Sequence, residues 1–228
     1  MSQVYAIIDC EALAPWTLDL GEVARALLAG GASTLQLRAK GFGHEQLLAI
    51  ARDVVGACAG MIGSDEVFIN DDVRVAKELA VGVHLGQDDL PPLAARARLG
   101  PRLRIGLSTH DEQQLLEGLA LPVDYVALGP VRPTANKLRP APALGVEHAN
   151  EIARRAKHLP HAKPLVAIGG VAADVVPALT SFDRLAVIGC LLPKPGETGA
   201  AALATISLRT RALTDACMRA FASGSVHA

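Results

Sequence analysis

Acidic side chains follow two neighbouring apolar runs in this chain of 228 residues, at the point where each run ends. Residues 70–72 read NDD and residues 87–89 read QDD. Paired carboxylates suit a hard divalent cation such as Mg²⁺, which takes one or two carboxylates and completes its shell with water and substrate phosphate. The pattern therefore indicates a magnesium site in which Asp71, Asp72, Asp88 and Asp89 are the candidate ligands.

Cations and glycines occupy corresponding positions after other apolar runs. Arg38 and Lys40 follow one of them, and Lys137 lies in the loop after another; cations of this kind bind phosphate oxygens. Glycines at 169–170 and 189 end the last two runs, and backbone N–H groups can approach a phosphate where no side chain intervenes. Together these residues predict a Mg²⁺-dependent enzyme that handles a pyrophosphate and a second phosphate.

Each of these features also has a purely structural interpretation. A lone Arg38 or Lys40 is most often an exposed cation, and the acids at 71–72 or 88–89 could cap helices. His84 lies inside an apolar run, which favours a packed or hydrogen-bonded core histidine over a catalytic one. Cys190 has no identifiable histidine partner, which favours packing over nucleophilic chemistry. A functional site is favoured only because polar residues follow so many of the apolar runs.

The apolar runs predict the fold that would bring these ends together. Near-continuous apolar strands are buried on both faces, and segments with helical spacing separate most of them, as in a parallel sheet with crossover helices. Eight such units predict a single (β/α)8 TIM barrel over residues 1–222, with a flexible tail at 223–228. An open doubly wound sheet is the rival, but its GxGxxG turn is missing. The predicted strands are 4–8, 33–38, 67–69, 81–85, 103–107, 123–129, 165–169 and 185–189.

Composition excludes several classes of partner. The formal charge is −1, so we expect neither a nucleic-acid surface nor a polybasic membrane patch. No uncharged apolar run approaches about 18 residues, and the first residues do not resemble a signal peptide. We expect a cytoplasmic protein that binds small molecules, with homo-oligomer formation left open. The four cysteines are expected to be reduced: Cys10, Cys58, Cys190 and Cys217.

A set of motifs in this order resembles the thiamine-phosphate synthase family, between about Thr34 and Leu192. The proline-rich stretch at 129–145, expected to be a binding loop, lies within it. GVHLGQ-x-D together with GP-x-x-PT-x-x-K is the most specific pair. The motifs are QLRAK, FINDD, GVHLGQDDLP, IGLSTH, DYVALGPVRPTANK, AIGGV and AVIGCLL.

The resemblance implies a barrel enzyme that needs Mg²⁺. It would join 4-amino-2-methyl-5-hydroxymethylpyrimidine pyrophosphate to a thiazole phosphate, giving thiamine phosphate and pyrophosphate. Asp71 and Asp89 match the positions that bind the metal ion in this family. Asp88 would then lie at a helix start, or close to the two ligands without binding the metal itself. Pyrophosphate contacts would be Arg38, Lys40, Asn70 and Lys137, and Gln36 and Ser108 would lie near the pyrimidine and the pyrophosphate. Arg38, Lys40, Lys137 and Ser108 would be catalytic. The remaining substrate-binding residues would be Thr134, Asn136, Gly169, Gly170 and Gly189.

Three positions depart from the family pattern. Asn136 replaces a threonine, Arg132 replaces an aromatic or apolar residue, and the sequence IGCLL around Gly189 lacks a serine that would bind the second phosphate. Two alternatives follow. A thiazole tautomerase on the same barrel could use His110 as an acid or base, and a non-catalytic protein could hold a thiamine precursor.

Overall fold

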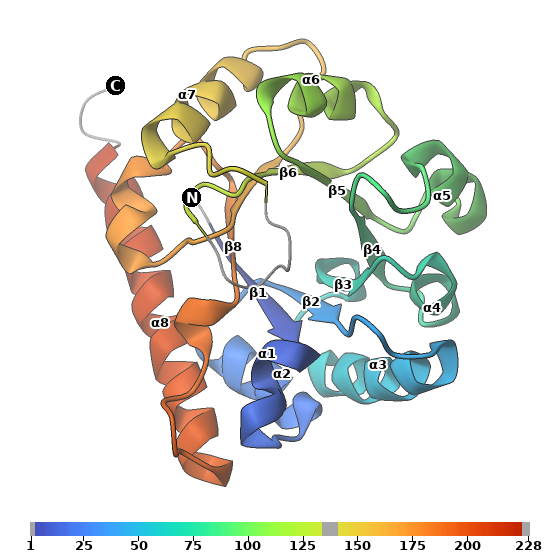
Figure 1. The fold of residues 1–228 in the computed structure, drawn as a ribbon, viewed down its shortest axis with the longest axis vertical. Helices are drawn as coiled ribbons and strands as arrows, with labels where there is room; N and C mark the ends of the chain where they lie inside the picture. The colour runs from blue at the N-terminus through green and yellow to red at the C-terminus, as the bar shows by residue number, and fades with distance from the viewer. Residues whose placement is uncertain (1–2, 134–140, 225–228) are drawn as a thin grey trace.

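The computed structural model describes residues 3–133 and 141–224 and shows a closed barrel of eight parallel strands within them. Each strand pairs with the next along the chain, and β8 pairs with β1 (Figure 1). This confirms the predicted (β/α)8 barrel. The strands are β1 Gln3–Asp9, β2 Thr34–Arg38, β3 Val67–Asn70, β4 Gly82–Leu85, β5 Ile105–Thr109, β6 Tyr125–Leu128, β7 Leu165–Ile168 and β8 Arg184–Val187.

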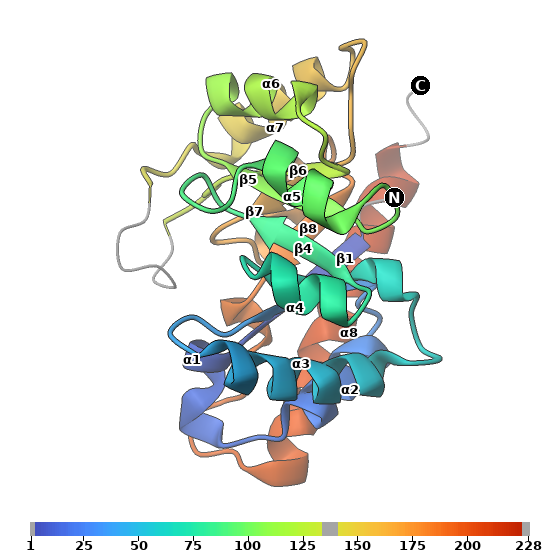
Figure 2. The same ribbon diagram turned by 90° about the vertical axis from the view of Figure 1, so that its right-hand side faces the viewer.

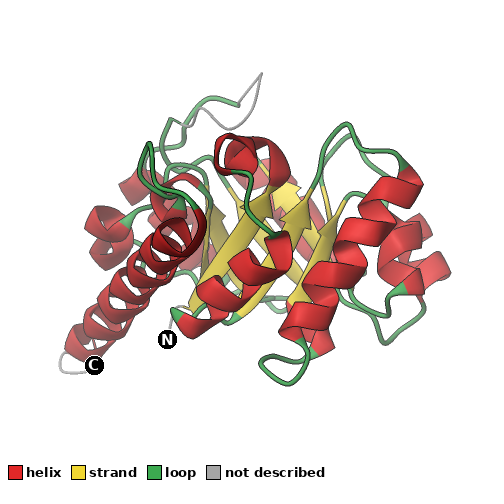
Figure 3. Cartoon of the chain, turned by 90° about the horizontal axis from the view of Figure 1, so that it is seen from below, coloured by secondary structure: helices red, strands yellow, loops and turns green. Residues whose placement is uncertain are grey.

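Helices surround the barrel, as Figure 3 shows with strands in yellow inside a ring of red helices. The connection from β7 to β8 contains only a short 3-10 segment, Ala173–Ala178, which holds Pro177. The helix α8 lies beside α2, so the last helix closes the ring against the first ones (Figures 1 and 2). The helices are α1 Cys10–Leu13, α2 Leu20–Ala29, α3 His44–Cys58, α4 Val73–Glu78, α5 Pro92–Leu99, α6 Glu112–Ala120, α7 Val146–Ala156 and α8 Gly199–Gly224.

The hydrophobic core has two shells because alternate residues of each strand point to opposite faces. The larger shell lies between strands and helices and is aliphatic apart from Phe182. The smaller shell fills the barrel interior and carries the aromatic rings: Tyr5, Ile7, Phe68, Tyr125, Ala127, Val166 and Ala186. No helix in the described part of the chain is long and apolar enough to cross a membrane.

Two glycines make room for the interior rings. A Cβ added at Gly82 would lie 2.5 Å from the ring of Phe68, and one added at Gly106 would lie 2.0 Å from Cζ of Tyr125. Phe68 and Tyr125 pack edge to face, with ring centroids 5.3 Å apart. Strands β4 and β5 therefore carry glycine where a side chain would displace the aromatic core.

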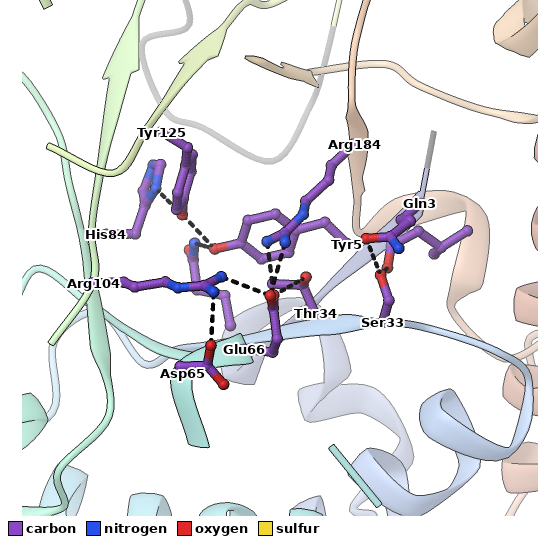
Figure 4. A network of polar contacts seen from close by, with 12 residues as sticks. Gln3, Tyr5, Ser33, Thr34, Asp65, Glu66, His84, Arg104, Tyr125 and Arg184 are labelled. Atoms are coloured by element: carbon purple, nitrogen blue, oxygen red, sulfur yellow. Dashed lines mark hydrogen bonds and ion pairs between the residues drawn. The ribbon is translucent and has the colours of Figure 1, made fainter. Parts of the chain in front are cut away.

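An ion-pair network closes the amino-terminal end of the barrel (Figure 4). Glu66 accepts hydrogen bonds from Thr34 Oγ1 at 2.7 Å, Arg104 Nη1 at 2.6 Å and Arg184 Nη2 at 2.8 Å. Arg104 also lies 2.7 Å from Asp65. These groups come from different strands and connections, and they satisfy one another, so this end needs no ligand. We call these five residues the basal network.

Candidate active site

A cavity of about 430 Å³ lies at the carboxyl-terminal mouth of the barrel. This volume suits a small organic ligand. The cavity brings together every described site residue that the family resemblance implies; Thr134, Asn136 and Lys137 lie outside the described residues. Those that line it are Gln36, Arg38, Lys40, Asn70, Asp71, Asp89, Ser108, Gly169, Gly170 and Gly189.

Two carboxylates meet across neighbouring strand ends. Asp71 follows β3 with a left-handed φ of 65°, and its backbone N–H donates to the carbonyl of His84 on β4 at 2.8 Å. Asp89 follows β4, and its carboxylate accepts from the N–H of Gly86 at 2.7 Å. Burial, followed by a hydrogen bond and repulsion from Asp89, raises the pKa of Asp71 to about 6. The two carboxylates therefore repel each other when both acids are ionised.

The chemistry of this pair fits Mg²⁺ better than a closed transition-metal site. The described residues contain no group of three or more His, Cys, Asp and Glu side chains that could hold a metal. A structural zinc needs four such ligands, whereas Mg²⁺ accepts one or two carboxylates and leaves its other positions to water and phosphate. Two oxygens from Asp71 and Asp89 meet that smaller requirement.

The other two candidate acids do not join the pair. Asp72 is the N-cap of α4, where its carboxylate accepts from the N–H groups of Arg74 and Val75 at 2.9 and 3.0 Å. Asp88 is exposed, and Pro91 occupies the N-cap position of α5. Of the two alternatives for Asp88, the helix-start position is therefore wrong, because the chain makes a further turn before the helix begins.

Two cations lie at the mouth in different states. Lys40 is half exposed, with its Nζ 3.6 Å from Asp71. Arg38 is largely buried and donates from Nη1 to Asp9 at 2.5 Å. Asp9 is only 2% exposed, and its other oxygen caps α1 by accepting from two backbone N–H groups at 3.1 Å. Asp9 thus holds the guanidinium of Arg38 in place, a function that the sequence analysis missed.

The glycines after β7 let another loop approach closely. Gly169 and Gly170 have φ values of 87° and 68°, which side chains rarely adopt. A Cβ on Gly169 would lie 2.4 Å from Pro130, and one on Gly170 would lie 2.5 Å from Arg132. The segment after β6 therefore rests on these glycines, and Arg132 also donates to Asp174 at 2.7 Å. Arg132, a departure from the family pattern, turns toward an exposed acid.

Cys190 and two histidines also line the cavity. Burial raises the pKa of Cys190 to about 11, so its thiol stays protonated at neutral pH and is a poor nucleophile. His110 contacts the carbonyl of Gly129 through Nδ1 at 2.7 Å. His84 is buried and hydrogen-bonded to Tyr125 and Ser108, which confirms the prediction of a hydrogen-bonded core histidine.

The chain is similar to known proteins over most of its length. The family model for thiamine monophosphate synthase matches residues 4–207. The thiamine-phosphate synthase of Koribacter versatilis is 34% identical over 203 residues, covering 86% of this chain and 92% of that protein. The synthase of Corynebacterium efficiens is 39% identical over 186 residues, covering 78% and 83%. The solved structure of thiamine phosphate pyrophosphorylase from Pyrococcus furiosus superposes with a TM-score of 0.75 at 25% identity, covering 96% of each chain. The chain therefore belongs to the thiamine monophosphate synthase family.

Proposed function

We propose that this protein is a thiamine-phosphate synthase. It joins the pyrimidine pyrophosphate to the thiazole phosphate and releases pyrophosphate. The observation that carries the proposal is the pair of adjacent carboxylates, Asp71 and Asp89, beside Lys40, in a chain of this family. Acids left in mutual repulsion lower the stability of the fold, and a function that requires a cation explains their presence.

Residues at the mouth would assist the departure of pyrophosphate in different ways. Asp71 and Asp89 would hold Mg²⁺, which when bound offsets the negative charge that grows on the leaving pyrophosphate. Arg38, oriented by Asp9, and the half-exposed Lys40 would contact the same oxygens. Asn70 and Lys137 belong to this group by family resemblance. No enzymic nucleophile is required if the pyrimidine–pyrophosphate bond ionises before the thiazole nitrogen attacks.

The remaining residues would position the two substrates against each other. Gln36 and Ser108 line the floor of the cavity and would meet the pyrimidine and its pyrophosphate. Gly169, Gly170 and Gly189 would present backbone to the thiazole phosphate, with Thr134 and Asn136. Catalysis would occur in one domain of residues 1–222, in the cytoplasm, on small-molecule substrates.

The alternatives gain no support from the comparisons. The matching family and the relatives described above carry the synthase name. Neither a thiazole tautomerase nor a non-catalytic binding protein requires two acids suited to a metal ion beside two cations at the mouth.

One assay tests the proposal. Purified protein is mixed with both substrates and Mg²⁺, and thiamine phosphate is measured with and without excess chelator. We expect product with Mg²⁺ and at least about a hundredfold less with chelator, since removing the cation costs several kcal/mol of charge stabilisation. Equal product in both conditions would remove the metal from the proposal, and no product in either would remove the synthase activity.

A further inference from the structure

A chain of hydrogen bonds runs through the barrel interior beneath the cavity. Gln36 Nε2 donates to the Tyr5 hydroxyl at 2.7 Å, and the two tyrosine hydroxyls lie 2.8 Å apart. The Tyr125 hydroxyl lies 2.7 Å from His84 Nδ1, and His84 Nε2 lies 2.8 Å from Ser108 Oγ. Figure 4 shows His84, Tyr125 and Tyr5 linked one after another next to the basal network. We call these five residues the buried relay.

The direction of the buried relay follows from counting protons. Tyr5 accepts from the amide of Gln36, so we assign its single proton to the hydrogen bond with Tyr125, and the proton of Tyr125 to the hydrogen bond with Nδ1 of His84. Burial raises the pKa of both phenols, so both keep their protons. A neutral His84 then carries its proton on Nε2 and donates it to Ser108.

Both ends of the buried relay face the cavity. Gln36 and Ser108 line it, and no described residue donates to Gln36 Oε1 in the structure. With the relay in this direction, Gln36 offers the cavity a carbonyl acceptor, and Ser108 keeps its own proton to donate. If the amide of Gln36 turned over, every proton in the relay would reverse, and Ser108 would become an acceptor.

We propose that His84, Tyr125 and Tyr5 are positioning residues that couple Gln36 to Ser108, so that the two read the pyrimidine substrate as one unit. This inference rests on the proposed function. An exocyclic amine needs an acceptor at Gln36, and a pyrophosphate oxygen needs a donor at Ser108. Only one direction of the relay supplies both.

The coupling predicts how a wrong substrate is rejected. An analogue with oxygen in place of the 4-amino group needs a donor at Gln36 and still needs a donor at Ser108. Either direction of the intact relay leaves one of these contacts repulsive, and a buried polar mismatch of this kind is penalised strongly. Cutting the relay would free Gln36 to turn over while Ser108 keeps its proton, so the analogue would be accepted more readily.

The test compares kcat/KM for the amino substrate and for the oxo analogue. Tyr125→Phe keeps the ring that packs on Phe68 and removes the hydroxyl that links Tyr5 to His84. We expect the wild type to prefer the amino substrate by at least about a hundredfold and Tyr125→Phe to lose at least about tenfold of that preference. Tyr5→Phe cuts the same relay at its next link and should behave alike, which covers a folding failure of either variant.

Thr34→Val is the matched control. It removes a buried hydroxyl that donates to Glu66 in the basal network, outside the relay and outside the cavity lining. It should leave the preference between the two substrates unchanged. A second readout is the tautomer of His84 by ¹⁵N NMR, where the relay predicts a proton on Nε2.

The outcomes separate the inference from the proposed function. Equal losses on both substrates in Tyr125→Phe, with the preference unchanged, would overturn the coupling while the synthase activity stands. A neutral His84 with its proton on Nδ1 would overturn the direction of the relay. A folded wild type that makes no thiamine phosphate from the amino substrate would remove the proposed function and the inference with it.

Discussion

The two ends of the barrel carry similar charged residues in different states. At the amino-terminal end, Glu66 meets Thr34, Arg104 and Arg184 within 2.8 Å, and the basal network satisfies itself. At the carboxyl-terminal mouth, Asp71 and Asp89 face each other, and Lys40 lies 3.6 Å from Asp71. Among the described residues, we call the basal network the complete end and the pair of Asp71 and Asp89 the incomplete end, because two adjacent carboxylates favour a bound cation.

The largest expected effect is the loss of unfolding free energy when the basal network at the complete end is broken. Glu66→Ala leaves Arg104 and Arg184 without their shared carboxylate, and removing one member of a largely buried ion-pair network costs about 3 kcal/mol of unfolding free energy. Urea unfolding measures the loss. The folded fraction should keep its synthase activity, since Glu66 lies at the opposite end from the cavity.

Glu78→Ala is the control for that variant. The pair of Arg52 and Glu78 is exposed on both sides, so its loss should change the unfolding free energy by less than about 1 kcal/mol. Equal losses in both variants would mean that the basal network stabilises no more than a surface pair.

The next largest effect is the loss of synthase activity when the carboxylate pair at the incomplete end is broken. Asp89→Asn removes one proposed metal ligand, and we expect thiamine phosphate formation to fall at least about tenfold, or about 1.4 kcal/mol. Without Mg²⁺ the unfolding free energy of this variant should stay equal or rise, because a repulsive charge is gone. Asp88→Asn, at an exposed position, is the matched control and should keep most of the activity. An equal loss of activity in that variant would mean that Asp88, and not Asp89 alone, binds the metal ion.

The pH dependence of Mg²⁺ binding tests whether Asp71 at the mouth binds the metal ion. The pKa of Asp71 is raised to about 6, above its unfolded value, so the native state holds the extra proton between about pH 4 and 6. Without metal, the contribution of Asp71 to unfolding free energy therefore falls as the pH rises through that window. Bound Mg²⁺ must displace the proton, so Mg²⁺ affinity should weaken about tenfold per pH unit below 6. Calorimetric titration at pH 5 and 7.5 measures it; equal affinities would contradict the assignment of Asp71.

The smallest effect concerns the support of Arg38. Asp9→Asn can keep the oxygen that caps α1 but loses the charge that holds the guanidinium. We expect kcat/KM for the pyrimidine pyrophosphate to fall about threefold, the scale of one weakened charge-assisted hydrogen bond. Asp19→Asn, at the exposed N-cap of α2, is the control and should leave kcat/KM unchanged. An unchanged kcat/KM in Asp9→Asn would show that Arg38 needs no such support.

The sequence predicts the mouth well because one rule governs it: polar residues follow apolar strands at their carboxyl ends. The same rule finds Asp9, which ends the first strand just as Asp71 follows the third. The rule alone does not separate a support for Arg38 from a helix cap, and Asp9 is also the N-cap of α1.

The barrel interior is harder to read from the sequence. Tyr5, His84 and Tyr125 come from strands far apart in the chain, and their hydroxyls and ring nitrogens meet only when the barrel closes. Glu66 precedes β3, and from the sequence it looks like an exposed acid. Its ion pair with Arg184 forms only because the last strand lies close to it in the closed barrel. Pairing between distant strands, rather than local pattern, decides both networks.

The most direct test of this account is the effect of Mg²⁺ with pyrophosphate on unfolding free energy at pH 7.5. A ligand that binds only the native state stabilises it in proportion to its affinity. We predict a clear rise for the wild type and for Asp88→Asn, and little or none for Asp89→Asn. An equal rise in all three proteins would contradict the claim that the incomplete end of the barrel is the metal site.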